Sequence, residues 1–375
     1  MFSVQHDVLD NFLTLVNIPS ESGDEAEIVE YLIKRLKLYT KNVYLDNPNN
    51  TFGKGVGNVI AKIKGNPRLP TIMFCAHMDT VKPGRNINPQ ILNNIIKTDG
   101  KTILAADDKA GIAAILTLLK VIHKEKFDSC PIEIVFTVGE ETGLFGSKRL
   151  SFDKINSKYC FILDSDGEVG GAVIKAPSYL YMNIAVRGKA AHAGMDAKSG
   201  VNAIKIAGDA ISKIPTGAVD SETTINVGKI SGGMAINIVP ESCNVEYEIR
   251  SYQEKNLKKY QTLIESSFKN AAKKYKGAVS ISAEQQFKKF DIDNNSKTLT
   301  LFRNACKKIK LDVKLEKSFG GSDANIFNER GIETLNLSVG YYKPHTSEEN
   351  IKLSSLKEIV DLIYTIVQLA GENCN

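Results

Sequence analysis

The sequence lacks any apolar run long enough to cross a membrane. Its longest such run, residues 110–119, ends at Lys120, whereas a membrane helix needs about 20 residues. The N-terminus carries Asp7 and Asp10 where a secretory signal has a basic segment and then an apolar one. We therefore expect a soluble protein of the cytoplasm with no membrane partner.

Paired cysteines are also lacking. The six cysteines, at positions 75, 130, 160, 243, 306 and 374, show none of the close spacings of a disulfide framework or a thiolate zinc site. We expect them to be core thiols. Cys75 shares a strand face with His77, which leaves it open as a reserve ligand.

No strong charge bias is present. The 48 basic and 43 acidic residues give a net charge of +5 that is dispersed along the chain, which argues against nucleic acid as a partner. With 42% hydrophobic and 24% charged residues, the composition is that of a globular protein. The length of 375 residues favours two domains or one large domain.

Apolar periodicity predicts an α/β domain. Short runs that are apolar on both faces are typical of strands in a sheet covered by helices. The expected strands cover residues 71–76, 132–138, 159–163 and 334–339, and the expected helices cover 9–16, 24–36, 110–122 and 359–367. The last strand and helix lie far downstream, so this domain, residues 1–177 and 290–375, is predicted to be discontinuous.

An inserted domain is predicted for residues 178–289. The order of its elements is strand, helix, strand, strand, helix, strand, which favours a ferredoxin-like α+β fold. The expected strands cover residues 179–186, 223–230, 244–249 and 278–283, and the expected helices cover 201–214 and 256–275.

Polar residues follow several of the expected strands of the first domain. His77 and Asp79 close one strand, Glu140 and Glu141 follow another, and Asp164 follows a third. Ligands in open α/β sheets bind at the carboxyl ends of the strands. Each motif taken alone is also compatible with a solvated turn.

Two more acids, Asp107 and Asp108, begin the apolar helix, where one of them would also suit the helix N-terminus. So many carboxylates together are costly unless cations neutralise them. His and carboxylate ligands suit zinc, cobalt or manganese, and this many acids predict two metals that share one carboxylate. His345, just after the late strand, supplies a second imidazole. Of Glu140 and Glu141, one can bind metal while the other accepts a proton from water, which indicates metal-assisted amide hydrolysis.

Five ordered motifs resemble those of the zinc-dependent superfamily of glutamate carboxypeptidase, aminoacylase and succinyl-diaminopimelate desuccinylase, and most closely its peptidase T-like branch. The motifs are His77-Met78-Asp79, Ala106-Asp107-Asp108-Lys109-Ala110-Gly111, Gly139-Glu140-Glu141-Thr142-Gly143, Leu163-Asp164 and Pro344-His345-Thr346. The resemblance implies a phosphorylase/hydrolase-like catalytic domain, two Zn²⁺ ions and release of the N-terminal residue from tripeptides.

The resemblance also implies roles for these residues. Asp107 would bridge the two metals, with Asp108 as the alternative. His77 and Asp164 would complete one metal site, and Glu141 and His345 the other. Glu140 would be the general base, and Asp79 would orient His77.

By the same resemblance, the inserted domain would be a lid and dimerisation domain through which a homodimer forms. Its residues His192, Asn237 and Arg250 would contact the short peptide substrate, and Gly320 would line the pocket. Arginine suits a peptide carboxylate because it can form two parallel hydrogen bonds. His192 could stabilise the oxyanion in its own chain or in a partner chain.

Other functions are weighed against this one. A carboxypeptidase, a dipeptidase or an N-acyl amino acid deacylase would use the same metal site. A non-catalytic peptide-binding protein could keep the fold. A dinucleotide-dependent oxidoreductase is suggested by Gly53-Lys54-Gly55-Val56-Gly57, but a strand rather than the required helix is expected to follow.

Overall fold

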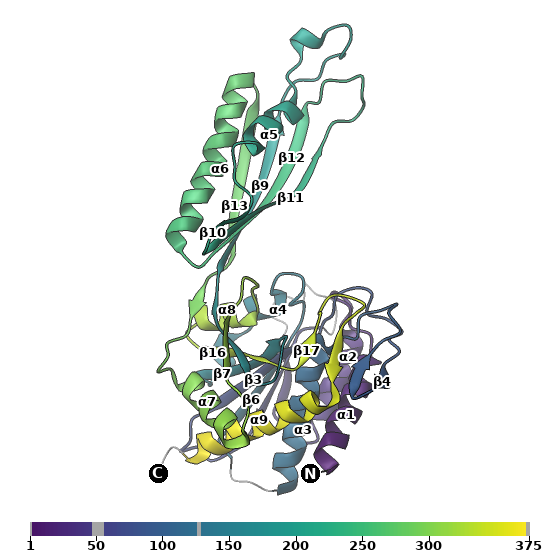
Figure 1. Cartoon of the computed structure of the whole chain (residues 1–375), viewed down its shortest axis with the longest axis vertical. Coiled ribbons are helices and arrows are strands. Elements are labelled where there is room, and N and C mark those ends of the chain that lie inside the picture. The colour runs from purple at the N-terminus through teal and green to yellow at the C-terminus, as the bar shows by residue number, and fades with distance from the viewer. Residues whose placement is uncertain (1, 47–55, 126–128, 373–375) are drawn as a thin grey trace. The chain divides into compact units, whose positions relative to one another are not determined.

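The computed structural model describes residues 2–46, 56–125 and 129–372. The chain forms two compact units (Figure 1). The first comprises Met1–Ile174, Asp291–Lys317 and Ser322–Asn375, and the second comprises Lys175–Phe290 and Ser318–Gly321. Residues 53–55 of the glycine-rich segment lie outside the described residues.

The short segment Ser318–Gly321 was not expected in the second unit. It is held there because Arg250 Nη1 donates to the Phe319 carbonyl at 3.0 Å and the Tyr252 hydroxyl donates to the Ser318 carbonyl at 2.8 Å. The Tyr252 and Phe319 rings also contact each other in a tilted arrangement, with centroids 4.7 Å apart.

The first unit is built on a mixed nine-stranded sheet, so the predicted α/β fold class is confirmed. The sheet has the order β1-β2-β6-β3-β7-β16-β8-β14, and β15 pairs with β8. Its strands are β1 (Val43–Asp46), β2 (Asn58–Ile63), β3 (Ile72–His77), β6 (Ile132–Thr137), β7 (Tyr159–Ser165), β8 (Gly171–Ala176), β14 (Phe290–Asp291), β15 (Lys314–Lys317) and β16 (Glu333–Ser338). The central strands β6, β3, β7 and β16 run parallel to their neighbours in this group.

Burial explains why these central strands were recognisable. Every residue of β3 and β6 is buried, and all but His77, Glu133 and Thr137 are apolar, as is typical of strands with both faces covered. The strand expected after the glycine-rich segment is also present, as β2.

Helices α1, α3, α9 and α7 pack against one another in that order, and α3 lies against β3 and β7. The helices of the first unit are α1 (Phe2–Val16), α2 (Ala26–Leu36), α3 (Ala106–Glu125), α4 (Phe145–Lys148), α7 (Lys297–Ile309), α8 (Asp323–Glu329) and α9 (Leu353–Glu372), with a 3₁₀ turn at Phe152–Lys154. Helix α3 is assigned from Ala106, but the backbone angles of Asp107 and Asp108 are not helical. Both acids therefore lie at a kink, and the regular helix follows them, close to the expected start at residue 110.

A small second sheet of the first unit has the order β17-β18-β5-β4. Its strands are β4 (Gln90–Leu92), β5 (Ile95–Lys97), β17 (Tyr341–Tyr342) and β18 (Asn350–Lys352). The segment between β17 and β18 contains His345, so this sheet fixes both ends of the loop that carries it.

The second unit contains a five-stranded sheet and two helices, of which α6 is the longer. Its elements are β9 (Ser178–Arg187), α5 (Ala203–Ile211), β10 (Gly217–Asp220), β11 (Thr223–Gly232), β12 (Ser242–Ser251), α6 (Glu254–Tyr275) and β13 (Ala278–Phe287), with a 3₁₀ turn at Ala197–Ser199. The order is β10-β11-β12-β9-β13 and each pairing is antiparallel. The four expected strands thus take the ferredoxin-like order, and β10 adds an unexpected edge strand.

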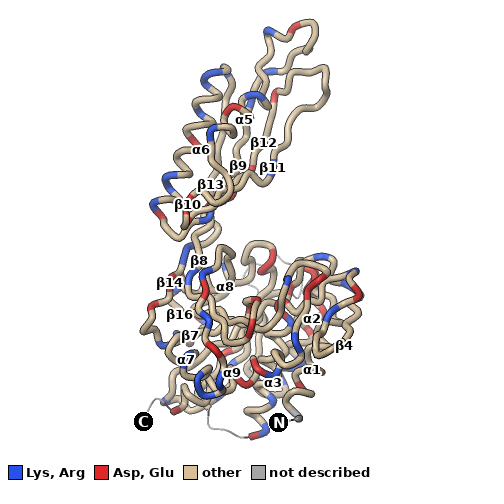
Figure 2. The backbone as a smooth tube through the Cα atoms, viewed as in Figure 1, with Lys and Arg blue, Asp and Glu red and all other residues tan. Residues whose placement is uncertain are grey.

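The core of the second unit forms between one sheet face and the two helices. Alternate residues of β9 are buried, and they pack with Ile206 of α5 and with Ile264 and Phe268 of α6. Charged residues of both signs are distributed along the chain in both units (Figure 2). Within the described parts of the chain, no helix combines the length and apolar character that a membrane span requires.

Candidate metal centre

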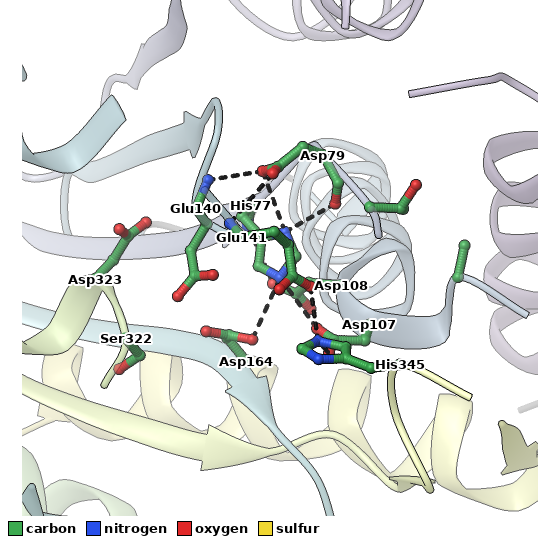
Figure 3. Close-up of polar contacts among 12 residues, drawn as sticks. His77, Asp79, Asp107, Asp108, Glu140, Glu141, Asp164, Ser322, Asp323 and His345 are labelled. Carbon is green, nitrogen blue, oxygen red and sulfur yellow. Dashed lines mark hydrogen bonds and ion pairs between the residues drawn. The ribbon is translucent and has the colours of Figure 1, made fainter. Parts of the chain in front are cut away.

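The candidate site lies at the carboxyl ends of the parallel strands of the first unit (Figure 3). His77 is the last residue of β3 and pairs in register with Thr137, the last residue of β6. Asp164 lies near the end of β7, which pairs with β3 on its other side. Strand direction therefore brings residues from distant parts of the sequence to one edge of the sheet.

One group of ligand atoms forms around His77. Its Nε2 atom lies 3.0 Å from Asp107 Oδ1 and 3.5 Å from Asp164 Oδ1. Its Nδ1 atom faces away, 2.9 Å from the backbone oxygen of Asp79. A neutral ring that donates from Nδ1 to this oxygen presents the Nε2 lone pair to the two carboxylates, as a metal ligand must.

A second group forms around His345. Its Nε2 atom lies 2.8 Å from Glu141 Oε1 and 3.2 Å from Asp107 Oδ2. The His345 side chain is 51% exposed, while Glu141 is only 9% exposed. This second group is therefore the more open of the two.

Asp107 belongs to both groups. Its Oδ1 faces His77 and its Oδ2 faces His345, so one carboxylate is placed to bridge two cations. The ligand atoms of His77, Asp107 and Asp164 lie within 4.8 Å of one another, as do those of Asp107, Glu141 and His345. Two imidazoles with oxygen donors suit a divalent ion such as zinc.

Asp108 has a different position. It is fully buried, and its Oδ2 accepts the backbone N–H of His77 at 3.1 Å. It therefore holds the end of β3 and is in none of the ligand groups found among the described residues. Cys75 is absent from the same groups, and burial raises the pKa of its thiol well above the usual value.

The pKa values of the cluster are shifted by burial and by the close contacts among its acids and imidazoles. Burial acts to raise the pKa of Asp107, but hydrogen bonds with His345 and His77 outweigh it and the pKa falls below its usual value. Hydrogen bonds to Asp107 and Glu141 raise the pKa of His345 to about 10. Burial and the nearby carboxylates raise the pKa of Asp164 to about 7. Bound divalent ions would relieve the repulsion among these neighbouring carboxylates.

Glu140 and Glu141 follow β6 in a turn whose backbone is held by Asp79. The two oxygens of Asp79 accept the N–H groups of Glu140 at 2.9 Å and Glu141 at 3.2 Å, and one also accepts the Ser22 hydroxyl at 2.7 Å. Asp79 Oδ1 lies 3.6 Å from His77 Nδ1. Asp79 therefore contacts His77 through its backbone oxygen, while its carboxylate holds the glutamate turn.

Glu140 lies on the same side of the site as Asp323 (Figure 3). Burial raises the pKa of Glu140 well above its usual value, and the charges of Asp164 and Asp323 add to the effect. Glu140 thus has a raised proton affinity beside the ligand groups. Glu140 also forms a third compact group with His77 and Glu141.

Three buried acids near the site were not anticipated from the sequence. Glu25 Oε1 accepts the N–H of Gly139 at 3.1 Å. Asp323 Oδ2 accepts the Thr137 hydroxyl at 2.6 Å. Glu349 contacts the loop that carries Asp107. Their exposed fractions are 0%, 2% and 1%. Asp323 and Glu349 each lie close to a sequence motif, whereas Glu25 is far from all of them, so no sequence signal marked it.

The predicted substrate residues His192, Asn237 and Arg250 lie in the second unit. His192 and Asn237 are exposed, and their segments pair through the Ala193 N–H and the Asn237 carbonyl at 2.9 Å. His192 Nδ1 accepts N–H groups from Gly194 and Met195 at 3.2 and 3.1 Å. A neutral ring in this arrangement carries its proton on Nε2.

Arg250 is partly buried within the second unit. Its guanidinium lies over the Tyr179 ring at 4.8 Å, and Nη2 contacts Glu248 Oε2 at 3.3 Å. Gly320 is also in this unit, and its N–H donates to Ser318 Oγ. The need for glycine is stronger at the next position, since a Cβ on Gly321 would lie 2.0 Å from the Phe287 ring.

Comparison with known sequences gives two family matches. The peptidase dimerisation domain matches residues 175–276, and peptidase family M28 matches residues 58–193. A Bacillus subtilis protein known as YqjE, described as uncharacterized, is 38% identical over 97% of this chain and 98% of its own length. Peptidase T of Clostridium botulinum is 26% identical over the same shares of the two chains.

Comparison with solved structures also gives similar peptidases. Aminopeptidase PepT from Bacillus cereus has a TM-score of 0.90 and 37% identity, over 98% of this chain and 99% of its own. A tripeptidase from Staphylococcus aureus has a TM-score of 0.93 and 34% identity over the same shares. A dinuclear metal-binding peptidase of the M20 family from Bacillus subtilis shares the fold, with a TM-score of 0.76 and 16% identity over 99% of each chain.

Proposed function

Because the chain belongs to the peptidase T-like branch of the M20 metallopeptidases, a family of peptide-bond hydrolases, we propose that it is a di-zinc tripeptide aminopeptidase. Its substrate would be a short peptide from which the N-terminal residue is released. The names of the similar aminopeptidase and tripeptidase support this specificity. The same metal chemistry would serve a carboxypeptidase, a dipeptidase or a deacylase, so the experiment below separates them.

The observation that carries the proposal is the position of Asp107 between two imidazoles. Its oxygens lie 3.0 Å from His77 Nε2 and 3.2 Å from His345 Nε2. The donor set fits two divalent ions because each group combines one imidazole with two carboxylates. His77, Asp107 and Asp164 would hold one ion, and Asp107, Glu141 and His345 the other. Zinc is the first choice, and cobalt or manganese would suit the same donors.

The ions, when bound, supply Lewis-acid activation of water and of the scissile carbonyl. Glu140 would take the proton from the attacking water and deliver it to the departing amine. Its position suits this role because Glu140 lies in a compact group with His77 and Glu141, beside the other ligand atoms. Asp79 would keep both glutamates in place through their backbone N–H groups.

Substrate contacts are proposed for the second unit. The Nε2–H of His192 would donate a hydrogen bond to the oxyanion, and the exposure of this residue leaves that atom accessible. Arg250 would bind the peptide carboxylate, and Asn237 and Gly320 would line the binding site. We assign Lys175–Phe290 the role of a lid.

The second unit would also support a homodimer. Its match to the peptidase dimerisation domain supports this assignment. Large apolar side chains there are exposed: Met195 at 82%, Met234 at 88% and Ile236 at 103%. Such exposure is costly in an isolated chain and is typical of a protein interface.

The test is product analysis on a defined tripeptide, with and without a chelator. The proposal expects metal-dependent release of the free N-terminal amino acid and a dipeptide. Release of the C-terminal residue would indicate a carboxypeptidase. Activity only on dipeptides or N-acyl amino acids would indicate a dipeptidase or a deacylase. Binding without metal-dependent hydrolysis of any of these would favour a non-catalytic peptide-binding protein.

A further inference from the structure

Glu349 makes three hydrogen bonds to the backbone that carries the shared ligand Asp107. Its Oε2 accepts the N–H groups of Leu104 at 2.7 Å and Ala105 at 2.8 Å, and its Oε1 accepts the N–H of Asp107 at 2.9 Å. Glu349 is 1% exposed. One buried carboxylate thus binds three of the four residues in the segment 104–107.

This segment needs an external partner. Leu104 and Ala105 are fully buried, and Asp107 is 8% exposed, so their N–H groups have no ready access to water. Ala105 has a φ of +60°, a left-handed conformation that a residue with a Cβ does not favour. Without Glu349, the loop would leave buried N–H groups unsatisfied in an unfavourable conformation.

Glu349 also belongs to the loop that carries His345. The Glu349 N–H donates to the Thr346 carbonyl at 3.2 Å, and Thr346 directly follows His345. Glu349 and Asp107 are 242 residues apart in the sequence. A single residue therefore joins the two segments: its side chain binds the backbone of the Asp107 segment, and its own backbone belongs to the loop that carries His345.

We propose that Glu349 is a positioning residue that holds Asp107 and His345 in their metal-binding arrangement before any metal arrives. This inference rests on the proposed metal pair and adds a residue that organises it. Metal then binds to a prepared site, and the ordering of the loop does not reduce the affinity. Residues that orient metal ligands by hydrogen bonding typically affect metal affinity 10- to 100-fold.

The first test uses hydrogen–deuterium exchange on the metal-free wild-type protein. The amides of Leu104, Ala105 and Asp107 should be protected without zinc, and added zinc should change this protection little. If these amides exchange freely in the metal-free protein and become protected only with zinc, the metal organises the loop and the proposal is wrong. This measurement needs no variant to fold.

The second test compares zinc affinities by competition with a chelator. Glu349→Gln replaces one acceptor oxygen with a donor that faces a backbone N–H, so its zinc dissociation constant should rise about 10- to 100-fold. Glu349→Asp keeps the charge on a shorter side chain and should show a smaller rise. If Glu349→Gln does not fold, the zinc dissociation constant of Glu349→Asp is compared with that of the wild type instead. Wild-type zinc affinity in the folded variant would overturn the proposal.

Glu133→Gln is the matched control. Glu133 is also buried, at 2% exposure, and accepts backbone N–H groups from Asn156 and Ser157, but it lies near the start of β6, at the opposite end from the site. Its zinc affinity should equal that of the wild type. A wild-type protein that binds zinc but cleaves no peptide would refute only the proposed function, whereas one that binds no zinc would refute both proposals.

Discussion

Asp107 and Asp108 are adjacent acids with unlike environments. Asp107 faces His77 and His345 with its two oxygens, whereas Asp108 accepts the backbone N–H of His77 from a fully buried position. One is placed to bind cations and the other to fix the strand end. The sequence left both assignments open because two neighbouring aspartates differ only in the direction of their side chains.

Replacing Glu140 with alanine tests the general base. Glu140→Ala should lower kcat for a tripeptide by about 100- to 10,000-fold, because the proton of the attacking water loses its acceptor. Two equivalents of zinc should remain bound, since Asp107, Glu141 and His345 are intact. Kinetics and metal analysis of one purified sample measure both quantities.

Glu141→Ala is the companion variant. It removes a group 2.8 Å from His345 Nε2, so zinc should be lost from the more open group together with activity. Near-normal turnover by Glu140→Ala, or retention of both zinc ions by Glu141→Ala, would require the roles of the two glutamates to be revised.

Glu25 should give the protein a pH-dependent instability. Burial, together with the charge of Asp79, raises its pKa from 4.5 to about 8. Between these pH values the folded protein holds a proton that the unfolded chain releases, so rising pH favours unfolding. Glu25→Gln lacks this titration, and its free energy of unfolding relative to the wild type should increase by roughly 1 to 4 kcal/mol from pH 5 to pH 8.

Urea unfolding of the metal-free proteins at several pH values measures this change. Glu133→Gln is the control, because hydrogen bonds with Lys62 and Ser157 outweigh burial and lower the pKa of Glu133. Its carboxylate stabilises the folded protein above the unfolded pKa, so this variant should gain nothing between pH 5 and pH 8. If the difference in free energy of unfolding between Glu25→Gln and the wild type did not change with pH, the raised pKa of Glu25 would be contradicted.

Neighbouring glutamates show where sequence reasoning reaches its limit. Glu348 is 70% exposed and contacts Lys343, while Glu349 is 1% exposed and binds the Asp107 loop. Nothing in the sequence around His345 separates them. The difference arises from a contact with a segment 242 residues away, which only the folded chain reveals.

Helix α3 approaches β7 so closely that Gly111 has no room for a side chain. A Cβ at this position would lie 2.5 Å from the Leu163 carbonyl and 2.4 Å from Asp108 Oδ1. Gly111→Ala should therefore lower the free energy of unfolding by about 1 to 3 kcal/mol, as overpacking does. It should also shift the strand that carries Asp164.

Gly208→Ala in helix α5 is the contrasting substitution. A Cβ there would meet no atom within 4 Å, so the higher helix propensity of alanine should raise stability by up to about 1 kcal/mol. Urea unfolding compares the two variants. If both substitutions changed the free energy of unfolding equally, the close contact at Gly111 would not be what excludes a side chain there.

Elements differ in how well the sequence predicts them. The buried strands β3, β6, β7 and β16 were predicted because two covered faces require continuous apolar residues. The strands β4 and β10 were missed because each has at most four residues and faces solvent along much of its length. The regular part of helix α3 was predicted because its apolar pattern begins near residue 110, whereas Asp107 and Asp108 before it have backbone angles that are not helical.

At the scale of the whole molecule, the two units should unfold separately. The ligand groups found among the described residues all belong to the first unit, so zinc should raise the temperature of its calorimetric transition and leave that of the second unit unchanged. Ile264→Ala, in the core of the second unit, should lower only the other transition. A single transition that zinc shifts as a whole would contradict this separation.

The position of β16 in the main sheet has a consequence for synthesis of the chain. Strands β7 and β8 follow each other in the sequence but are not neighbours in the sheet, because β16 lies between them. Until residue 338 has left the ribosome, β7 has an unpaired edge beside an unfinished metal centre. Such an edge can pair with other chains. The nascent protein is therefore most exposed to aggregation while the second unit is being made. Strand β16 ends this period, and it is followed by the loop that brings His345, the last ligand, into place.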